Sequence, residues 1–371
     1  MLRNVHHHPR LAGLFLAVIA LAGCGRGQPH PAPLPVAVSA PPAASLCERI
    51  EAVIAHARDR RRLDAAVHGA WQIIHGILAY GPDLPLAHDG QTTPALEYLL
   101  AGGSVTGWQL RPGSRGVIAV VEEGSTTGQG HPDQWIGYLS QCGVGGIPLA
   151  TKLSIRGRTF SLADLLEQAR HDIRQGQEAS WTLMALTAYL PPDAEWRAGD
   201  GARWTTERVV RMEAEADLSS SACGGAHRLA ALALALAAHR SAAPDPDAPL
   251  TGGWAAAADR VADAIDRARR FQQPDGGFST HFFQRPGTSP DVFAQLGATG
   301  HVFEVLAIAL DDEALAAGWV TRAAERLVTL LERTADVDVE CGALYHAVHG
   351  LILYNQRMCR GSTPAVARDD G

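Results

Sequence analysis

Aromatic residues are scarce in this sequence, since Phe, Trp and Tyr together make up only 6% of its 371 residues. Charge is also low: Asp, Glu, Lys and Arg account for 19%, and the net charge of -7 comes without a cluster of Lys or Arg. Proteins that bind nucleic acids present a basic surface to the phosphates. We therefore expect no nucleic-acid partner.

The N-terminal region has no hydrophobic run long enough to cross a membrane. Its apolar run, 11–21, has about the length of a signal-peptide core, whereas a membrane-spanning helix needs about 20 apolar residues. The run ends in Leu21-Ala22-Gly23-Cys24, which resembles a bacterial lipobox. This resemblance predicts a signal peptide over 1–23 and lipidation of Cys24. The protein would then be exported and lipid-anchored to a bacterial membrane, facing the periplasm or the cell surface. An ordinary secretory signal with a chance cysteine is the alternative.

Regular hydrophobic periodicity is missing from 25–44, which is rich in Pro and Ala. Such a composition stays extended and solvated, so 24–44 is predicted to be the lipid anchor and a linker. The end of the chain, 361–371, is predicted to be a disordered tail. One folded domain is expected between them, over 45–360.

Alanine and leucine dominate the apolar residues of this domain, which favours helices over sheets. A helix that is apolar all round must be enclosed by protein. We therefore predict a mainly α fold, an α/α toroid of about five or six helical hairpins in which outer helices wrap inner ones. A stacked solenoid of helical hairpins gives similar pairs and is the alternative. Both architectures would explain a pattern that occurs three times, in which a charged, amphipathic segment is followed by an apolar one. The pairs are 46–62 with 64–80, 205–219 with 225–239, and 314–333 with 340–358.

Two small β-hairpins are predicted to interrupt the helices. Strand-forming residues flank Pro112-Gly113 within 107–123 and Arg156-Gly157 within 152–160. The cysteines that follow Cys24 are odd in number, so at least one is unpaired or a ligand. If the helices close into a ring, Cys47 and Cys359 meet near its two ends, and we hypothesise a disulfide between them.

Histidines recur on the apolar helices of the domain. A lone buried histidine is usually a satisfied core residue, but several in similar positions need partners, and burial disfavours their charged form. We expect at least two of them to line one central cavity. These histidines are His75, His227, His301, His346 and His349.

The Gly-rich segment 122–135 is the second region of interest. Glu122 or Glu123 would form an acid/base pair with His131 on a loop, with Gln134 in the same segment. A polar surface loop that leads into the next helix is the alternative.

Two segments resemble the superfamily of terpenoid cyclases and protein prenyltransferases, whose members are α/α toroids. Phe271–Ser279 looks like the Gln-x-x-Asp-Gly-Gly-Phe turn between repeats. Ala343–Ala347 with Gly350-Leu351 resembles the Tyr-His-Thr…Gly-Leu helix of prenyltransferase β subunits. The histidine of that helix is a zinc ligand, so the resemblance implies this role for His346. Cys341 stands nearby in place of the family's Asp-x-Cys pattern.

The whole chain also looks like a group of uncharacterised bacterial proteins. They share the Gly-His-Pro-Asp-Gln and Ser-Ala-Cys-Gly-Gly-x-His-Arg segments found here. In the second segment, Cys223 and His227 stand at i and i+4 and could also chelate zinc, because thiolate and imidazole suit this ion. There are two alternatives. The small Cys-Gly pair begins the helix and lets helix ends pack closely, or the thiol is a nucleophile.

The leading functional hypothesis is an envelope protein whose histidine-lined cavity binds an extracytoplasmic ligand of glycan or lipid type. If the protein also processes this ligand, we expect lyase or hydrolase chemistry, by acid/base or metal-assisted steps. A terpenoid cyclase or prenyltransferase is disfavoured, because few aromatic residues are present to guard a carbocation. The alternative from another class is a non-catalytic envelope scaffold or protein-interaction module.

The candidate site residues fall into three groups. The catalytic candidates are His131, His227, His301 and His346, with Glu122 or Glu304 as partner, Glu304 being placed to orient His301. The ligand-binding candidates are His75, His349, Trp71, Tyr345 and Gln134. The metal candidates are His346 and Cys341, with zinc as the cofactor.

Overall fold

The structure is a computed structural model that describes residues 44–360, except 122–130 and 144. The chain divides into two compact units, 1–43 and 44–371, and the account below concerns the second. The predicted signal peptide, Cys24, most of the linker, Glu122, Glu123 and the tail therefore lie outside the described residues.

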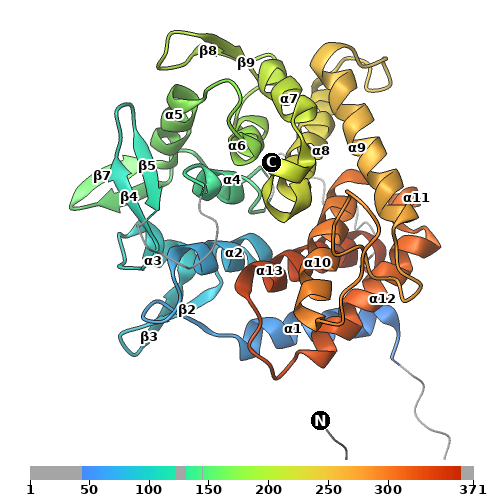
Figure 1. The fold of residues 1–371 in the computed structure, drawn as a ribbon. Helices are drawn as coiled ribbons and strands as arrows, with labels where there is room; N and C mark the ends of the chain where they lie inside the picture. The colour runs from blue at the N-terminus through green and yellow to red at the C-terminus, as the bar shows by residue number, and fades with distance from the viewer. Residues whose placement is uncertain (1–43, 122–130, 144, 361–371) are drawn as a thin grey trace, which may run out of the picture. The chain divides into compact units, whose positions relative to one another are not determined.

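The described part is mainly helical, with small β-hairpins (Figure 1). Six helices contact one another in a closed cycle: each packs against the next, and the last packs against the first. In Figure 1 they surround the centre of the view. In order around the cycle they are α2 (Ala70–Tyr80), α4 (Gln134–Leu139), α6 (Ser180–Tyr189), α8 (Ala226–Ala242), α10 (Val292–Ala309) and α13 (Cys341–Met358).

A second set of helices packs on the outside of these six, which we call the inner helices. The outer helix α12 is amphipathic, so one face packs inward and the other, which is charged, faces out. Six of its buried residues form one apolar stripe at helical spacing: Val320, Ala323, Ala324, Leu327, Val328 and Leu331. The inner helix α10 is instead buried along most of its length. The outer helices are α1 (Leu46–Arg60), α3 (Ala95–Leu100), α5 (Leu162–Asp172), α7 (Thr206–Glu215), α9 (Gly252–Arg270) and α12 (Gly318–Arg333).

The prediction of two β-hairpins was incomplete. The expected ones are β4–β5 (Trp108–Pro112, Val117–Val121) and β6–β7 (Lys152–Ile155, Arg158–Ser161). The described residues also contain β2–β3 (Pro85–His88, Gln91–Pro94), which β1 (Leu63–Asp64) extends, and β8–β9 (Glu195–Arg197, Arg203–Thr205). The missed signal for β2–β3 is Asp89-Gly90, whose φ angles of 46° and 75° suit a type I′ turn.

Three of these hairpins belong to a repeated unit of inner helix, hairpin and outer helix. In each unit the first residue of the outer helix donates its N–H to the carbonyl just before the first strand. The pairs are Ala95 with Leu84 at 2.7 Å, Leu162 with Thr151 at 3.1 Å and Thr206 with Ala194 at 3.2 Å. The units are α2–β2–β3–α3, α4–β6–β7–α5 and α6–β8–β9–α7.

The ends of several helices differ from the sequence-based expectation. The helix predicted from Asp64 begins only at Ala70, because Leu63 and Asp64 pair with β2 as a strand. The segment 314–333 holds a short α11 (Asp312–Leu315) and a separate α12. Ser161 caps α5, with its backbone N–H 2.7 Å from the Asp164 carboxylate.

Helix α10 begins at Val292. It is long and apolar enough to cross a membrane, the one such helix within 44–360 as described, but 61% of that stretch is buried inside the protein. It packs against α8, α12 and α13 and is a core helix.

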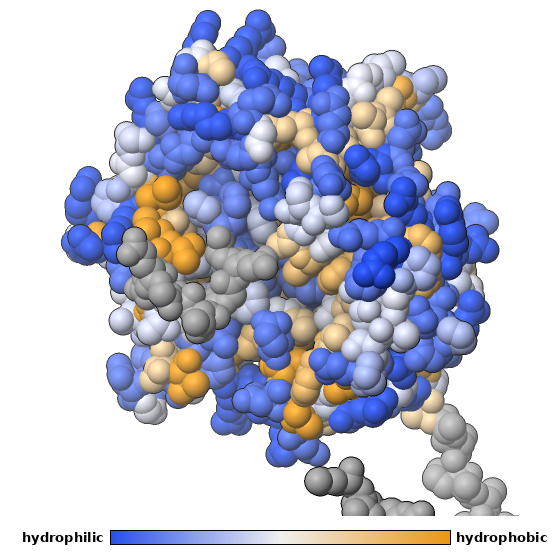
Figure 2. Space-filling view, in the orientation of Figure 1, coloured by the Kyte–Doolittle hydropathy of each residue, from blue (hydrophilic) through white to orange (hydrophobic). Residues whose placement is uncertain are grey.

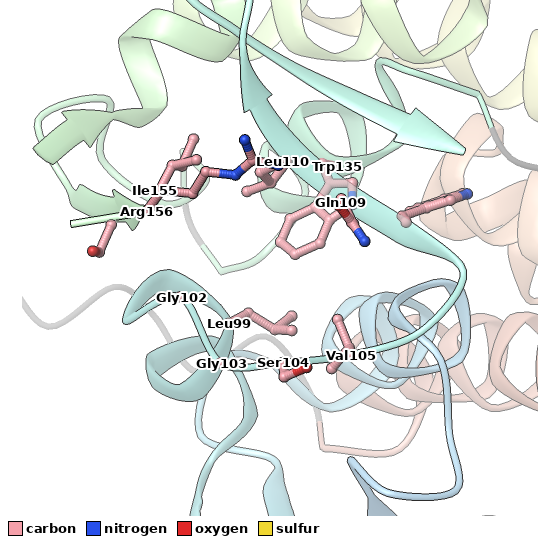
Figure 3. A pocket seen from close by; sticks show the side chains of 12 residues that line it. Leu99, Gly102, Gly103, Ser104, Val105, Gln109, Leu110, Trp135, Ile155 and Arg156 are labelled. Carbon is pink, nitrogen blue, oxygen red and sulfur yellow. The ribbon is translucent and has the colours of Figure 1, made fainter. Parts of the chain in front are cut away.

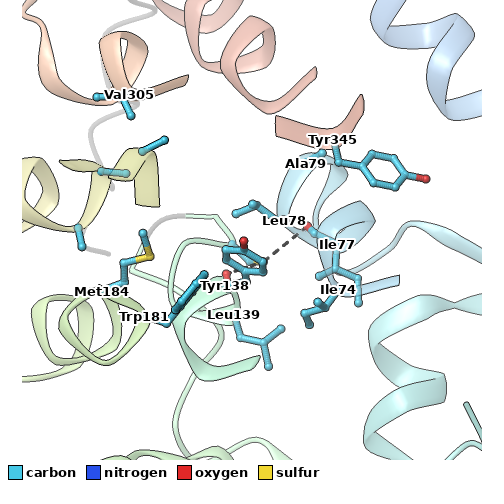
Figure 4. Packing of buried hydrophobic residues seen from close by; sticks show 14 of the residues in the cluster. Ile74, Ile77, Leu78, Ala79, Tyr138, Leu139, Trp181, Met184, Val305 and Tyr345 are labelled. Carbon is cyan, nitrogen blue, oxygen red and sulfur yellow. Dashed lines mark hydrogen bonds between the residues drawn. The ribbon is translucent and has the colours of Figure 1, made fainter. Parts of the chain in front are cut away.

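Apolar side chains fill the space between neighbouring inner helices. Figure 4 shows Tyr138 of α4 between Leu78 of α2 and Trp181 of α6, all three buried. Hydrophilic residues cover most of the outer face seen in Figure 2. The two ends of the helical part meet as hypothesised: Cys47 of α1 forms a disulfide with Cys359 after α13, with 5.6 Å between their Cα atoms.

Candidate functional site

A cavity of about 360 Å³ receives a side chain from each of the six inner helices. On α2, α4, α6 and α8 this side chain stands in the first turns, as in Trp71, the second residue of α2, and Gln134, the first of α4. Helices from distant parts of the chain therefore present these side chains to one space. The lining residues are Trp71, His75, Gln134, Trp181, Ala222, Cys223, His227, His301, Glu340, Gly342 and His346.

Four of the predicted histidines come together around this cavity. The ring centroid of His346 lies 4.3 Å from that of His301, 5.0 Å from that of His227 and 5.2 Å from that of His75. Burial, and then the neighbouring imidazoles, lower the pKa of His75 and His227, the pKa of each falling well below its usual value. Burial also lowers the pKa of His346. These three rings are therefore neutral at pH 7.

His346 and His349 share one buried carboxylate. Their Nδ1 atoms lie 2.7 and 2.6 Å from the two oxygens of Glu304. Burial alone would raise the pKa of Glu304, but the two imidazoles outweigh it and hold the pKa well below its usual value. Glu304 was expected to orient His301, but both of its carboxylate oxygens bond with His346 and His349 of α13 instead.

Two glycines allow this contact by letting α10 and α13 approach each other closely. A Cβ on Gly300 would lie 2.9 Å from Cβ of Ala347, and one on Gly350 would lie 3.1 Å from Cα of Glu304. Both separations are tight for real side chains. The backbone spacing therefore sets the distance between Glu304 and the imidazoles.

The hydrogen bonds of Glu304 fix which ring nitrogens carry protons. His346 donates from Nδ1 to Glu304, so its Nε2 is an acceptor. The Nε2 atom of His227 lies 3.2 Å away and must therefore donate to it. This leaves Nδ1 of the neutral His227 as a lone-pair acceptor, and this buried atom has no hydrogen-bond partner among the described residues.

His75 and His301 are held in a similar way. Their Nδ1 atoms lie 2.6 Å from the carbonyl oxygen of Trp71 and 2.7 Å from that of Gly297, so each donates to the helix backbone. The Nε2 atom of His75, whose ring is neutral, is then the one free to accept. For His75 the donor is the hydroxyl of Tyr138 at 3.2 Å, and Gln134 donates in turn to that oxygen at 3.1 Å.

Cys223 reaches the cavity from a tight turn between η1 (Leu218–Ser220) and α8. It lies in η2 (Ala222–Gly225), where Cys223, Gly224 and Gly225 have φ angles of 51°, 61° and 84°. A left-handed conformation is strained for cysteine, and such strain gathers at functional sites. A side chain on Gly224 would strike Phe282 at 2.5 Å, so glycine is required there.

Cys223, His227 and His301 form a compact donor group. One sulfur or nitrogen atom from each lies within 4.8 Å of the other two. Burial lowers the pKa of His301, but the neighbouring Cys223 outweighs it and raises the pKa to about 9. His301 is therefore protonated at pH 7 and pairs with Cys223, and the two stand beside His227.

The other predicted site residues lie outside this group. His131 stacks on Trp181 with ring centroids 5.0 Å apart, and Trp181 also contacts His227, so the indole lies between the two histidines. Tyr345 packs on Tyr80 at 6.2 Å and does not line the cavity. His349 reaches the site only through Glu304.

Cys341, named as a metal candidate with His346, is turned away from it. Positions i and i+5 are about 140° apart around a helix, so the two side chains leave different faces of α13. The thiol of Cys341 bonds with Gln72 instead. Cys223 takes the place expected of Cys341.

Sequence reasoning did not assign Trp181 or Glu340 to the cavity, and it named Cys223 only as a possible zinc ligand or nucleophile. A signal for Trp181 was present, because Trp71, Trp135 and Trp181 each stand second in their inner helix. Glu340 caps α13 by accepting from the N–H groups of Gly342 and Ala343, both at 2.8 Å.

A second hollow, of about 240 Å³, lies between the hairpins β4–β5 and β6–β7 and the end of α3. Figure 3 shows Leu99 and Val105 opposite Leu110 and Trp135 across it. No predicted catalytic histidine lines this hollow, and its ionisable lining residue is Arg156.

No family model, no curated protein and no solved structure matches this chain. The site must therefore be interpreted from its own chemistry.

Proposed function

We propose that the helical unit is an α/α toroid of an exported, lipid-anchored bacterial protein, related to the squalene-cyclase-like superfamily. Its central cavity binds an extracytoplasmic ligand and acts on it as a lyase or hydrolase. The closed cycle of inner helices with outer helices packed on it supports the toroid. The lipobox supports the location.

One observation carries the catalytic part: the relay Glu304–His346–His227 ends in an unpartnered lone pair. A buried acceptor without a donor is costly, so its retention indicates a role. When Nδ1 of His227 takes a proton from a ligand, the relay places a carboxylate behind the new positive charge, as in acid/base catalysis. His301, with a pKa of about 9, supplies a proton donor beside this base.

The lining favours a glycan over a lipid. It combines imidazoles, an amide and a carboxylate with two indoles and has no Leu, Ile or Val. The half-buried Trp71 offers a flat indole on which a sugar ring can stack, whereas Trp181 is held between His131 and His227. The exposed large hydrophobic residues of the described part are few, namely Val67, Val121, Phe293 and Val337, which argues against a scaffold.

The test is a thermal-shift screen of the purified protein with N-acetylglucosamine oligomers and peptidoglycan fragments, followed by mass spectrometry of the products. We expect one glycan to raise Tm, with the shift lost in Trp71→Ala and retained in Arg156→Ala, which lies in the second hollow. We also expect turnover to fall at least 100-fold in His227→Gln. A shift with lysophospholipid alone would refute the glycan, and no shift with any probe would favour the scaffold.

The location is tested separately through Cys24. Labelling of cells with a fatty-acid analogue should mark the wild-type protein, and Cys24→Ala should lose both the label and the membrane fraction. Retained label in this variant would refute the lipid anchor.

A further inference from the structure

We infer that Cys223, His227 and His301 bind a single divalent transition-metal ion, with zinc preferred. The inference deepens the function proposed above and rests on it for the claim that this cavity is the reactive site. When the ion is bound, His227 and His301 act as its ligands, and the metal takes over the role that proton transfer by these two imidazoles would have in the same cavity.

The separations suit a tetrahedral site. With zinc–sulfur and zinc–nitrogen bonds of about 2.3 and 2.0–2.1 Å, ligand atoms stand about 3.3–3.6 Å apart. The three donor atoms already lie within 4.8 Å of one another, so small side-chain adjustments close the site around an ion. One thiolate with two imidazoles is a donor set that zinc prefers among common ions.

The proton positions also suit a metal. His301 uses its Nδ1–H on the Gly297 carbonyl, and this leaves Nε2 as its ligand atom. His227 uses its Nε2–H on His346, so its ligand atom is the unpartnered Nδ1. Imidazole ligands of metals commonly donate their second N–H to a carboxylate or carbonyl. His301 donates to the carbonyl of Gly297 directly, and His227 reaches the carboxylate of Glu304 through His346.

Cys223 is placed independently of the two histidines. Its thiol is free, and the left-handed turn with Gly224 and Gly225 holds it beside the first turn of α8. Three protein ligands leave the fourth position of the ion open toward the cavity. This arrangement is typical of catalytic zinc sites, in which the open position takes a water molecule or a substrate oxygen.

The experiment uses the full-length protein in detergent, stripped with a chelator under anaerobic conditions and titrated with Co²⁺ and then Zn²⁺. We expect one equivalent of Co²⁺ to bind with a sulfur-to-cobalt charge-transfer band and zinc to displace it. Cys223→Ser should lose the band. Cys341→Ser, the matched control at another half-buried thiol, should keep it. His346→Gln should weaken zinc binding 10- to 100-fold through His227.

A second measurement guards against variants that fail to fold. In the wild type, zinc should slow alkylation of Cys223 at least tenfold, while the rate at Cys341 stays the same. Absence of stoichiometric metal, a band that survives in Cys223→Ser, or equal alkylation with and without zinc would overturn the site. If the glycan still shifts Tm and turns over in the stripped protein, the metal proposal fails and the acid/base function stands.

Discussion

His346 donates its Nδ1–H to Glu304 over 2.7 Å, and this bond joins the two longest inner helices in the middle of the domain. The same carboxylate also accepts a hydrogen bond from Nδ1 of His349, so one acidic residue on α10 orients two imidazoles of α13. The proton pattern of the cavity follows from this carboxylate.

Glu304→Gln should destabilise the protein by about 2–4 kcal/mol, because an amide cannot accept from both imidazoles and turns its own N–H toward one of them. Urea unfolding monitored by circular dichroism measures this loss. Glu332→Gln is the matched control: Glu332 pairs with Arg49 at the surface, at 2.7 Å, and its loss should cost less than about 1 kcal/mol. Equal effects of the two substitutions would contradict the buried role of Glu304.

Gly350→Ala should cost about 1–3 kcal/mol, because the new methyl group would force α10 and α13 apart. Gly297→Ala is the control on the facing helix. Its Cβ would meet Ala343 at 3.5 Å, an ordinary contact, so higher helix propensity should leave the protein as stable or up to about 1 kcal/mol more stable. The two variants should shift the unfolding midpoint in opposite directions, and a shift of the same sign would argue against close packing at Gly350.

The stability of the metal-free protein should fall as pH is lowered below about 6.5. The pKa of His75 is lowered by burial, then by His346 and His301, against the opposing effects of the Trp71 carbonyl and Glu304. Between its folded and unfolded pKa values the unfolded chain binds more protons, so protonation favours unfolding as pH drops. His75 alone should contribute up to about 1.4 kcal/mol per pH unit. Unfolding curves from pH 8 to 5 should therefore be less steep in pH for His75→Gln, and parallel curves would refute a neutral buried His75.

The disulfide between Cys47 and Cys359 closes a loop with a sequence separation of 312 residues. A double Cys47→Ser, Cys359→Ser variant should lose about 2–5 kcal/mol, mainly because its unfolded chain is less restrained. Tm of the wild type should fall on reduction, whereas Tm of the double variant should not respond to reductant. A wild-type Tm that is insensitive to full reduction would show that the bond adds no stability.

The sequence carried enough information to place the four histidines on apolar helices, because such helices must be buried and their imidazoles must find partners. It could not place Glu304, because the hydrogen bonds of this carboxylate go to α13, and the packing of α13 on α10 cannot be read from the sequence. Cys341 and Cys223 both precede Gly, and only the left-handed turn at Cys223 brings a thiol to the cavity. The hairpin β2–β3 was missed because Asp89-Gly90 lies between short strands with few apolar residues.

The meeting of the two ends of the helical unit has a practical consequence for engineering. Since the Cα atoms of Cys47 and Cys359 are 5.6 Å apart, a short peptide can replace the disulfide as the link between α1 and α13. New termini can then be opened in the exposed turn of β8–β9 at Asp200-Gly201. Such a circular permutant keeps the order of helices around the cavity while reversing which repeat is made first by the ribosome.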